Sequence, residues 1–211
     1  CTARPAATRL GPPSRTGAVV VWHDLASPPD LYRLDVKTGP HGGLHPLTRV
    51  NATLLGARSL SEFEQFTFKG WNNEDAFGYV VKPAGFKPDG KFPIAFIVHG
   101  GPQVSFQNQW NWRWNAQAYA GRGYGVVFID FHGSPGYGQA FTDSISEHWG
   151  DRPFEDLQKG RAAALEINPW LDGKRACSLG AFAASAPSSG APFWPTNCSA
   201  DTDSPSAQRL R

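Results

Sequence analysis

The hydrophobic pattern of the chain centres on two continuous apolar runs, residues 94–98 and 125–130. Continuous runs, in contrast to alternating ones, are typical of strands that are covered on both faces of a parallel sheet. The stretch between the two runs predicts a tryptophan-rich helix that ends at Gly121, a common helix stop. We therefore expect a β-α-β unit, with two adjacent parallel strands, as the centre of the fold.

Before this unit, residues 17–58 show short apolar segments separated by turn residues. Residues 18–22 and 31–35 are predicted strands, and the Ser-Pro-Pro-Asp cluster at 27–30 predicts the turn that makes them antiparallel. Residues 46–48 are a further short extended piece. Successive hairpins of this kind indicate a piece of a β-propeller, whereas residues 1–16 have no periodicity and predict a flexible lead-in.

Residues 59–181 predict the first part of an α/β domain. Residues 66–68 and 77–81 are strand-like, and the polar cluster at 72–75 predicts a hairpin turn between them. Residues 83–93 indicate a surface loop, because Gly and Pro are frequent there. An amphipathic helix over 154–167 and a short strand over 175–180 complete the predicted elements of this part.

The pattern stops at residue 182. Of the 30 residues from 182 to 211, 16 are Ala, Ser or Pro, with neither helical nor strand periodicity, which is a disorder-like composition. Two explanations stay open: a genuine linker or regulatory tail, or the out-of-frame translation of a GC-rich gene. The coding DNA around codon 182 distinguishes them.

Composition excludes several classes of protein. The net charge is +2 with mixed signs, so nucleic acid is not an expected partner, although the Trp and Arg cluster at 110–114 leaves a single-strand binder as a third hypothesis. No run approaches the roughly 20 apolar residues of a membrane span. The three cysteines lie too far apart for a four-ligand zinc site, and we expect neither a metal nor a cofactor.

Several short motifs occur in a specific order and spacing, although each is weak alone. Their residues are Phe-Thr-Phe-Lys-Gly at 66–70, Gly-Tyr-Val-Val-Lys-Pro at 78–83, His-Gly-Gly-Pro at 99–102, Gly-Ser-Pro-Gly-Tyr-Gly at 133–138 with Phe141, His-Trp-Gly-Asp at 148–151 and Asp-Gly-Lys-Arg at 172–175. Together they resemble the serine peptidases of the prolyl oligopeptidase family, most closely its dipeptidyl-peptidase and acylaminoacyl-peptidase branch. The resemblance implies the end of a β-propeller followed by an incomplete α/β-hydrolase.

The resemblance also implies a site. His99, Gly100 and Gly101 would form the oxyanion region, and Tyr137 would lie in the loop that borders the substrate cleft. The position that matches the nucleophilic serine is Phe182, and no histidine follows it, so no catalytic residue is expected intact. Ser178 and Ser185 lack the nucleophile-elbow context.

The function implied is therefore that of a fragment of a serine peptidase which releases short N-terminal peptides, with this chain itself inactive and a peptide as the substrate of the intact parent. The alternative is a catalytically dead peptide-binding or regulatory fragment. The chain contains no methionine and starts at Cys1 without a leader, which indicates a piece of a longer product. For that parent we expect a periplasmic or secreted location, with the cytoplasm as the alternative.

Overall fold

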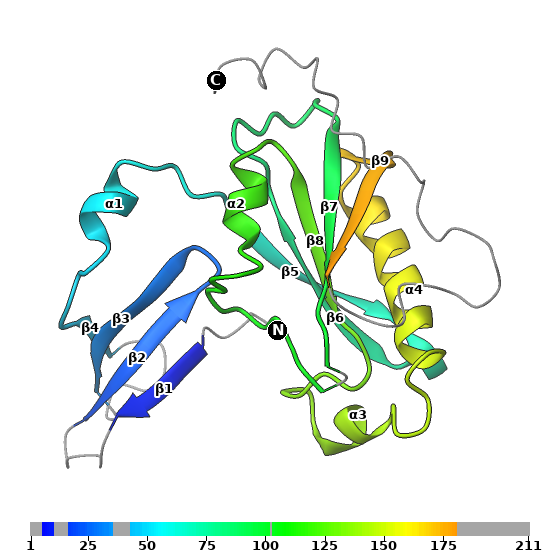
Figure 1. The fold of residues 1–211 in the computed structure, drawn as a ribbon, viewed down its shortest axis with the longest axis horizontal. Coiled ribbons are helices and arrows are strands. Elements are labelled where there is room, and N and C mark those ends of the chain that lie inside the picture. The colour runs from blue at the N-terminus through cyan, green and yellow to red at the C-terminus, as the bar shows by residue number, and fades with distance from the viewer. Residues whose placement is uncertain (1–5, 11–16, 36–42, 102, 181–211) are drawn as a thin grey trace.

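The computed structural model describes residues 6–10, 17–35, 43–101 and 103–180, of which 6–10 are described as backbone only. These residues form two sheets, with the short helix α2 (Ala116–Ala120) between them in Figure 1. The predicted tail, including Phe182, lies outside the described residues. The predicted division at residues 58 and 59 falls between the two sheets.

The first sheet has four antiparallel strands in sequence order: β1 (Ala6–Leu10), β2 (Ala18–Asp24), β3 (Ser27–Leu34) and β4 (Leu44–Pro46). The expectation of a flexible lead-in over 1–16 is wrong for β1, which pairs with β2 from Ala6 opposite His23 to Leu10 opposite Val19. A five-residue segment has too little pattern of its own, and the edge of β2 supplies its hydrogen-bond partners. Helix α1 (Ala52–Gly56), which was not predicted, follows this sheet.

The turn between β2 and β3 lies earlier than predicted. The chain turns at Leu25 and Ala26, where the backbone N–H of Ala26 donates to Asp24 at 2.8 Å, and the expected turn residues 27–30 belong to β3. The pairing shifts between Trp22 and Asp24, so the two prolines of β3 lie beside an irregularity. Proline is tolerated in a sheet at such a bulge, where no ladder hydrogen bond is required from it.

The second sheet has five strands in the order β5-β6-β8-β7-β9. Strand β7 (Phe92–Val98) is parallel to β8 (Gly125–Asp130) and to β9 (Leu171–Gly180), which confirms the predicted pair of adjacent parallel strands. Strands β5 (Phe63–Lys69) and β6 (Asp75–Val81) form the predicted antiparallel edge, joined by the 3-10 turn η1 (Trp71–Asn73).

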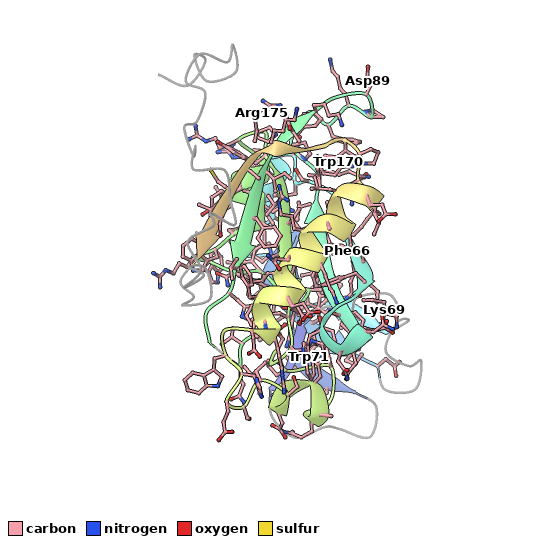
Figure 2. All side chains as sticks on the ribbon, turned by 90° about the vertical axis from the view of Figure 1, so that its right-hand side faces the viewer. Phe66, Lys69, Trp71, Asp89, Trp170 and Arg175 are labelled. Atoms are coloured by element: carbon pink, nitrogen blue, oxygen red, sulfur yellow. The ribbon has the colours of Figure 1, made fainter. Side chains whose placement is uncertain are left out.

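Alternate residues of the central strands enter two separate apolar clusters, one on each face of the sheet. Ile94, Phe96 and Val98 face α4 (Arg152–Ile167), whereas Ala95 and Ile97 face α2. Figure 2 shows α4 crossing the sheet, beside Phe66 and Trp170. This double burial explains why the strands have continuous apolar sequences.

Helix α4 lies close to the sheet because it carries a glycine at the point of contact. A Cβ atom on Gly160 would lie 2.6 Å from Ile129 Cδ1 and 2.8 Å from Phe68 Cζ, so a larger residue would displace the helix. Leu157, one turn earlier, is buried in the same cluster. The predicted helix over 154–167 is confirmed, and α4 begins two residues earlier, at Arg152.

The predicted tryptophan-rich helix is wrong in its first half. Helix α2 includes none of the three tryptophans, because two asparagines impose turns before it. The Asn111 side chain accepts from the backbone N–H groups of Arg113 and Trp114, at 2.9 and 2.8 Å. The Asn115 side chain then caps α2 by accepting from the N–H of Gln117 at 2.8 Å. Helix α3 (Gln139–Asp143) was not predicted.

Among the described residues, no helix combines the length and the apolar character that crossing a membrane requires.

Substituting Leu157 tests the packing of α4. We expect Leu157→Ala to lower the free energy of unfolding by about 2–5 kcal/mol, because the substitution leaves a cavity under the helix. The measurement is urea denaturation followed by circular dichroism. Ile167→Ala is the matched control, since Ile167 is an exposed apolar residue at the end of the same helix and should change the free energy by no more than about 0.5 kcal/mol. Equal losses in both variants would contradict this packing.

Candidate functional site

The carboxyl ends of β7 and β8 lie side by side, since the strands are parallel and Ile97 is opposite Phe128. The residues that follow β7 are His99, Gly100 and Gly101, and those that follow β8 lead into the 133–138 loop. Ligands of open α/β sheets bind at this edge. The two motifs that the sequence singled out thus meet at one end of the sheet.

His99 is 3% exposed and is hydrogen-bonded through both ring nitrogens. Its Nδ1 lies 2.9 Å from the carbonyl oxygen of Gly100. A carbonyl oxygen only accepts hydrogen bonds, so Nδ1 carries the proton of the neutral ring. Nε2 then accepts a hydrogen bond from the Ser134 hydroxyl at 3.0 Å. Burial lowers the pKa of His99, which favours this neutral form. The ring also stacks on Phe131, with 4.0 Å between centroids. His99 is therefore a fixed, neutral part of the loop base.

Asp130, the last residue of β8, is completely buried and accepts three hydrogen bonds. The donors are the Ser105 hydroxyl at 2.8 Å, the Phe106 backbone N–H at 3.0 Å and the Tyr137 hydroxyl at 2.6 Å. Two of these donors belong to the loop after β7 and the third to the loop after β8. One carboxylate thus holds both loops at the same place.

Tyr137 is oriented inward. Its hydroxyl donates to Asp130, and its ring stacks on Phe77 with 4.3 Å between centroids. Burial and the negative charge of Asp130 raise the pKa of Tyr137, so the hydroxyl stays protonated. Because the hydroxyl donates within the protein, only the partly exposed ring of Tyr137 can contact a ligand at this edge.

The turn after His99 exposes backbone donors. Gly101 has φ +153° and is exposed, and a Cβ atom there would lie 2.8 Å from the backbone nitrogen of Gln103. Within the part of the chain that the structure describes, neither Gly100 nor Gly101 donates a backbone hydrogen bond. Two N–H groups beside a sheet edge are the donor type that stabilises an oxyanion.

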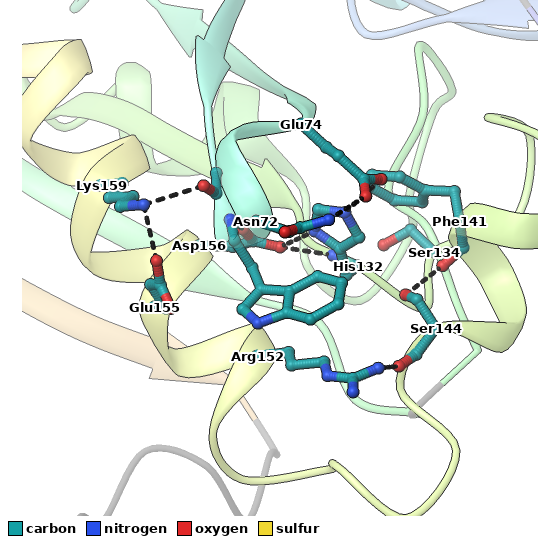
Figure 3. Close-up of polar contacts among 12 residues, drawn as sticks. Asn72, Glu74, His132, Ser134, Phe141, Ser144, Arg152, Glu155, Asp156 and Lys159 are labelled. Atoms are coloured by element: carbon teal, nitrogen blue, oxygen red, sulfur yellow. Dashed lines mark hydrogen bonds and ion pairs between the residues drawn. The ribbon is translucent and has the colours of Figure 1, made fainter.

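A second polar network fixes the start of the loop after β8 (Figure 3). The buried carboxylate of Asp156, on α4, accepts the backbone N–H and the Nδ1–H of His132, both at 2.6 Å, and the backbone N–H of Trp71 at 2.6 Å. The other ring nitrogen of His132 faces Glu74 at 3.4 Å. Gly70 has to be a glycine here, because a Cβ atom would lie 2.2 Å from the Asp156 carboxylate.

Burial by itself lowers the pKa of His132, but the hydrogen bond and charge of Asp156, helped by Glu74, more than offset this and raise the pKa above its usual value. The ring of His132 packs between Phe141, stacked at 4.2 Å between centroids, and Trp71. The Arg152 guanidinium lies over the Trp71 ring, 4.0 Å from its centroid. Arg152 also donates to the carbonyl oxygen of Ser144, as drawn in Figure 3. The network joins α4 to the loops around the site.

The structure brings together part of the predicted site. His99 and Tyr137 both lie against Asp130, with 3.9 Å between His99 Nε2 and Asp130 Oδ1, and Gly100 and Gly101 follow directly. Sequence reasoning missed Asp130, Ser105 and Ser134, although a carboxylate that ends an apolar strand was a signal for the first. The described ranges contain no cluster of residues arranged to hold a metal ion.

The mixed sheet with helices on both faces, preceded by a separate antiparallel sheet, defines the class: part of an α/β-hydrolase that follows part of a β-propeller. Comparison with known proteins gives the family. Residues 110–183 match the sequence model described as "Prolyl oligopeptidase family", which confirms the predicted resemblance.

Curated relatives are peptidases. The chain is 37% identical over 123 residues to dipeptidyl-peptidase 5 of Schizosaccharomyces pombe and 36% identical over 154 residues to the probable dipeptidyl-peptidase 5 of Emericella nidulans. These alignments cover 58% and 72% of this chain but 18% and 21% of the relatives. The chain thus spans about a fifth of their length.

Solved structures show the same architecture. An acylaminoacyl peptidase in complex with Z-Gly-Gly-Phe-chloromethyl ketone superposes with a TM-score of 0.71 and 25% identity, over 85% of this chain and 28% of the other. Dipeptidyl peptidase 4 of Porphyromonas gingivalis has a TM-score of 0.64 at 18% identity, over 84% of this chain and 25% of the other, and so supports the fold alone.

Removing the Tyr137 hydroxyl tests the Asp130 network. We expect Tyr137→Phe to lower the free energy of unfolding by about 1.5–3 kcal/mol, because a buried carboxylate loses one donor. Chemical denaturation at neutral pH measures the change. Tyr124→Phe is the control, since the Tyr124 hydroxyl makes no hydrogen bond with the described residues; a loss no larger than that of the control would refute the role of Tyr137.

The raised pKa of His132 predicts a pH dependence. Its contribution to stability is fully present below the unfolded pKa of about 6.5 and is lost as the pH rises through the higher folded value. We therefore expect the free energy of unfolding of the wild type, measured by urea denaturation at increasing pH from 5.5, to fall as His132 loses its proton. This decline should be absent in His132→Asn, which keeps a donor toward Asp156. The exposed His45→Asn is the control and should retain the decline; a decline that persists in His132→Asn would contradict this assignment.

Proposed function

We propose that this chain is part of a serine peptidase that releases short N-terminal peptides, and that it carries the oxyanion side of the active site. The observation that carries the proposal is the pair of backbone N–H groups at Gly100 and Gly101, which donate to none of the described residues. They follow His99, which its two ring hydrogen bonds hold at the carboxyl edge of the sheet. The names of the relatives, dipeptidyl-peptidases, support the substrate class.

In the mechanism that we propose for the whole protein, a serine attacks the carbonyl carbon of the scissile peptide bond and a histidine accepts the serine proton. The carbonyl oxygen becomes an oxyanion as the tetrahedral intermediate forms. A backbone N–H of the Gly100 and Gly101 turn donates to that oxygen, and loss of one such donor typically reduces kcat by roughly 10²–10³-fold. The histidine then returns the proton to the leaving amine.

We further propose that the chain by itself does not hydrolyse peptides. Phe182 occupies the nucleophile position in the motif alignment, and a phenyl ring has no group that attacks a carbonyl. The serines nearest to the site do not replace it. Ser134 is completely buried and its proton is donated to a neutral, buried His99, whereas Ser178 lies within β9, opposite Phe96, and not on a strand-to-helix turn.

A chain without a nucleophile that keeps exposed backbone donors could still bind a peptide carbonyl. The N–H groups of Gly100 and Gly101 therefore also support the second candidate, a catalytically inactive peptide-binding fragment, and covalent labelling separates the two.

A fluorophosphonate probe tests the inactivity of this chain, because it labels only activated serines. We expect no labelling of the purified, folded chain at probe concentrations that fully label an active serine hydrolase run in parallel. Labelling that survives in Ser134→Ala and Ser178→Ala would place a competent serine elsewhere, and labelling abolished by one of these substitutions would identify it. Either result would overturn the proposed inactivity.

A further inference from the structure

The hairpin between β2 and β3 contacts the loop that carries the proposed oxyanion donors. We call this loop, residues 99–101 and 103–115, the post-β7 loop. In Figure 1 the tip of the hairpin lies against the segment that leads into α2. We infer that Leu25, Asn108 and Gln117 are positioning residues, through which the first sheet sets the conformation of the post-β7 loop. The inference rests on the proposed function for the role of that loop.

Two hydrogen bonds join the hairpin to the loop. The N–H of Leu25 donates to the Asn108 side chain at 3.1 Å, and the N–H of Trp110 donates to His23 Nδ1 at 3.0 Å. Asn108 is 4% exposed, so the first of these bonds is shielded from water. These bonds join residues more than 80 positions apart in the chain.

Gln117, at the start of α2, connects three segments. Its Nε2 donates to the carbonyl oxygen of Leu25 at 3.2 Å and to that of Ser61 at 3.0 Å, and its Oε1 accepts the N–H of Ser61 at 2.7 Å. Ser61 lies just before β5, in the connection between the two sheets. The buried amide of Gln117 thereby forms hydrogen bonds with backbone groups of both the hairpin tip and the connection between the sheets.

The side chain of Leu25 adds an apolar contact to these bonds. Although it belongs to the first sheet, it is buried in the apolar cluster of the second, together with Phe106 and Ala116. Phe106 is in turn bonded through its backbone N–H to Asp130. The post-β7 loop is thus held from one side by its own sheet and from the other by the hairpin of the first sheet.

The loop contains an uncommon backbone conformation between these attachments. Gln107, between Phe106 and Asn108, has φ +46°, in the left-handed region that few non-glycine residues adopt and that costs free energy. Oxyanion donors act through a fixed geometry, so the elements that fix a donor loop influence its function. Displacement of the first sheet would release Leu25 and with it this geometry.

Hydrogen exchange of the whole chain, followed by mass spectrometry, tests the inference. We expect Leu25→Ala, which removes the apolar contact, and the length-conserving Gln117→Met, which removes the amide bonds to Leu25 and Ser61, each to speed exchange of the amides at 103–110 by roughly tenfold. Amides of β7 and β8 should keep their protection. Val19→Ala is the matched control, because Val19 is a partly exposed apolar residue of the same hairpin, away from its tip; it should leave the loop unchanged.

Two results would overturn the inference: unchanged exchange at 103–110 in both variants, or a rise that only parallels that of the whole chain, which a general loss of stability produces. The exchange experiment requires neither a nucleophile nor a substrate. Its failure would therefore leave the proposed peptidase function intact, and fluorophosphonate labelling of the chain would not affect the inference.

Discussion

Burial of the Asp130 carboxylate is the constraint on which the site depends. Removing an ion of this size from water costs several kcal/mol, and no cation lies against it to offset the cost among the described residues. Three hydrogen-bond donors offset the cost instead: a hydroxyl and a backbone N–H from the loop after β7, and a phenol from the loop after β8. The loops after β7 and β8 are therefore ordered together, because either one alone would leave the charge under-satisfied.

The elements that the sequence predicted best are those whose pattern is set by burial on both faces. Strands β7 and β8 follow from their uninterrupted apolar runs, and α4 follows from its amphipathic period. The failures concern segments whose conformation depends on a partner. The prolines of β3 were taken for a turn because the irregularity that accommodates them arises only from pairing with β2. The tryptophans before α2 are drawn out of the helix by two asparagine side chains, a local competition that periodicity does not show.

The same distinction applies to the site. The His-Gly-Gly-Pro and Gly-Ser-Pro-Gly-Tyr-Gly motifs indicated the two loops of the candidate site, and the parallel strands that precede them explain why the loops meet. What the motifs did not show is the set of carboxylates beneath them. Asp130 binds residues 24 and 25 positions away, and Asp156 binds Trp71 across 85 positions. Contacts over such separations are decided by the packing of α4 and the sheet, and a single sequence contains little trace of them.

The loop after β8 is bound at closely spaced positions by two buried carboxylates. Asp130 ends the strand and receives the Tyr137 hydroxyl, while Asp156 binds both the backbone and the ring of His132. Surface loops usually tolerate changes in length, because their backbone is solvated. Here one inserted or deleted residue between 130 and 137 would move a donor away from one carboxylate or the other. This loop can therefore diversify through partly exposed side chains, such as that of Pro135, but not by growing or shrinking. Gly136 and Gly138 are not free to change in this way, because a side chain at their φ of +104° would be strained.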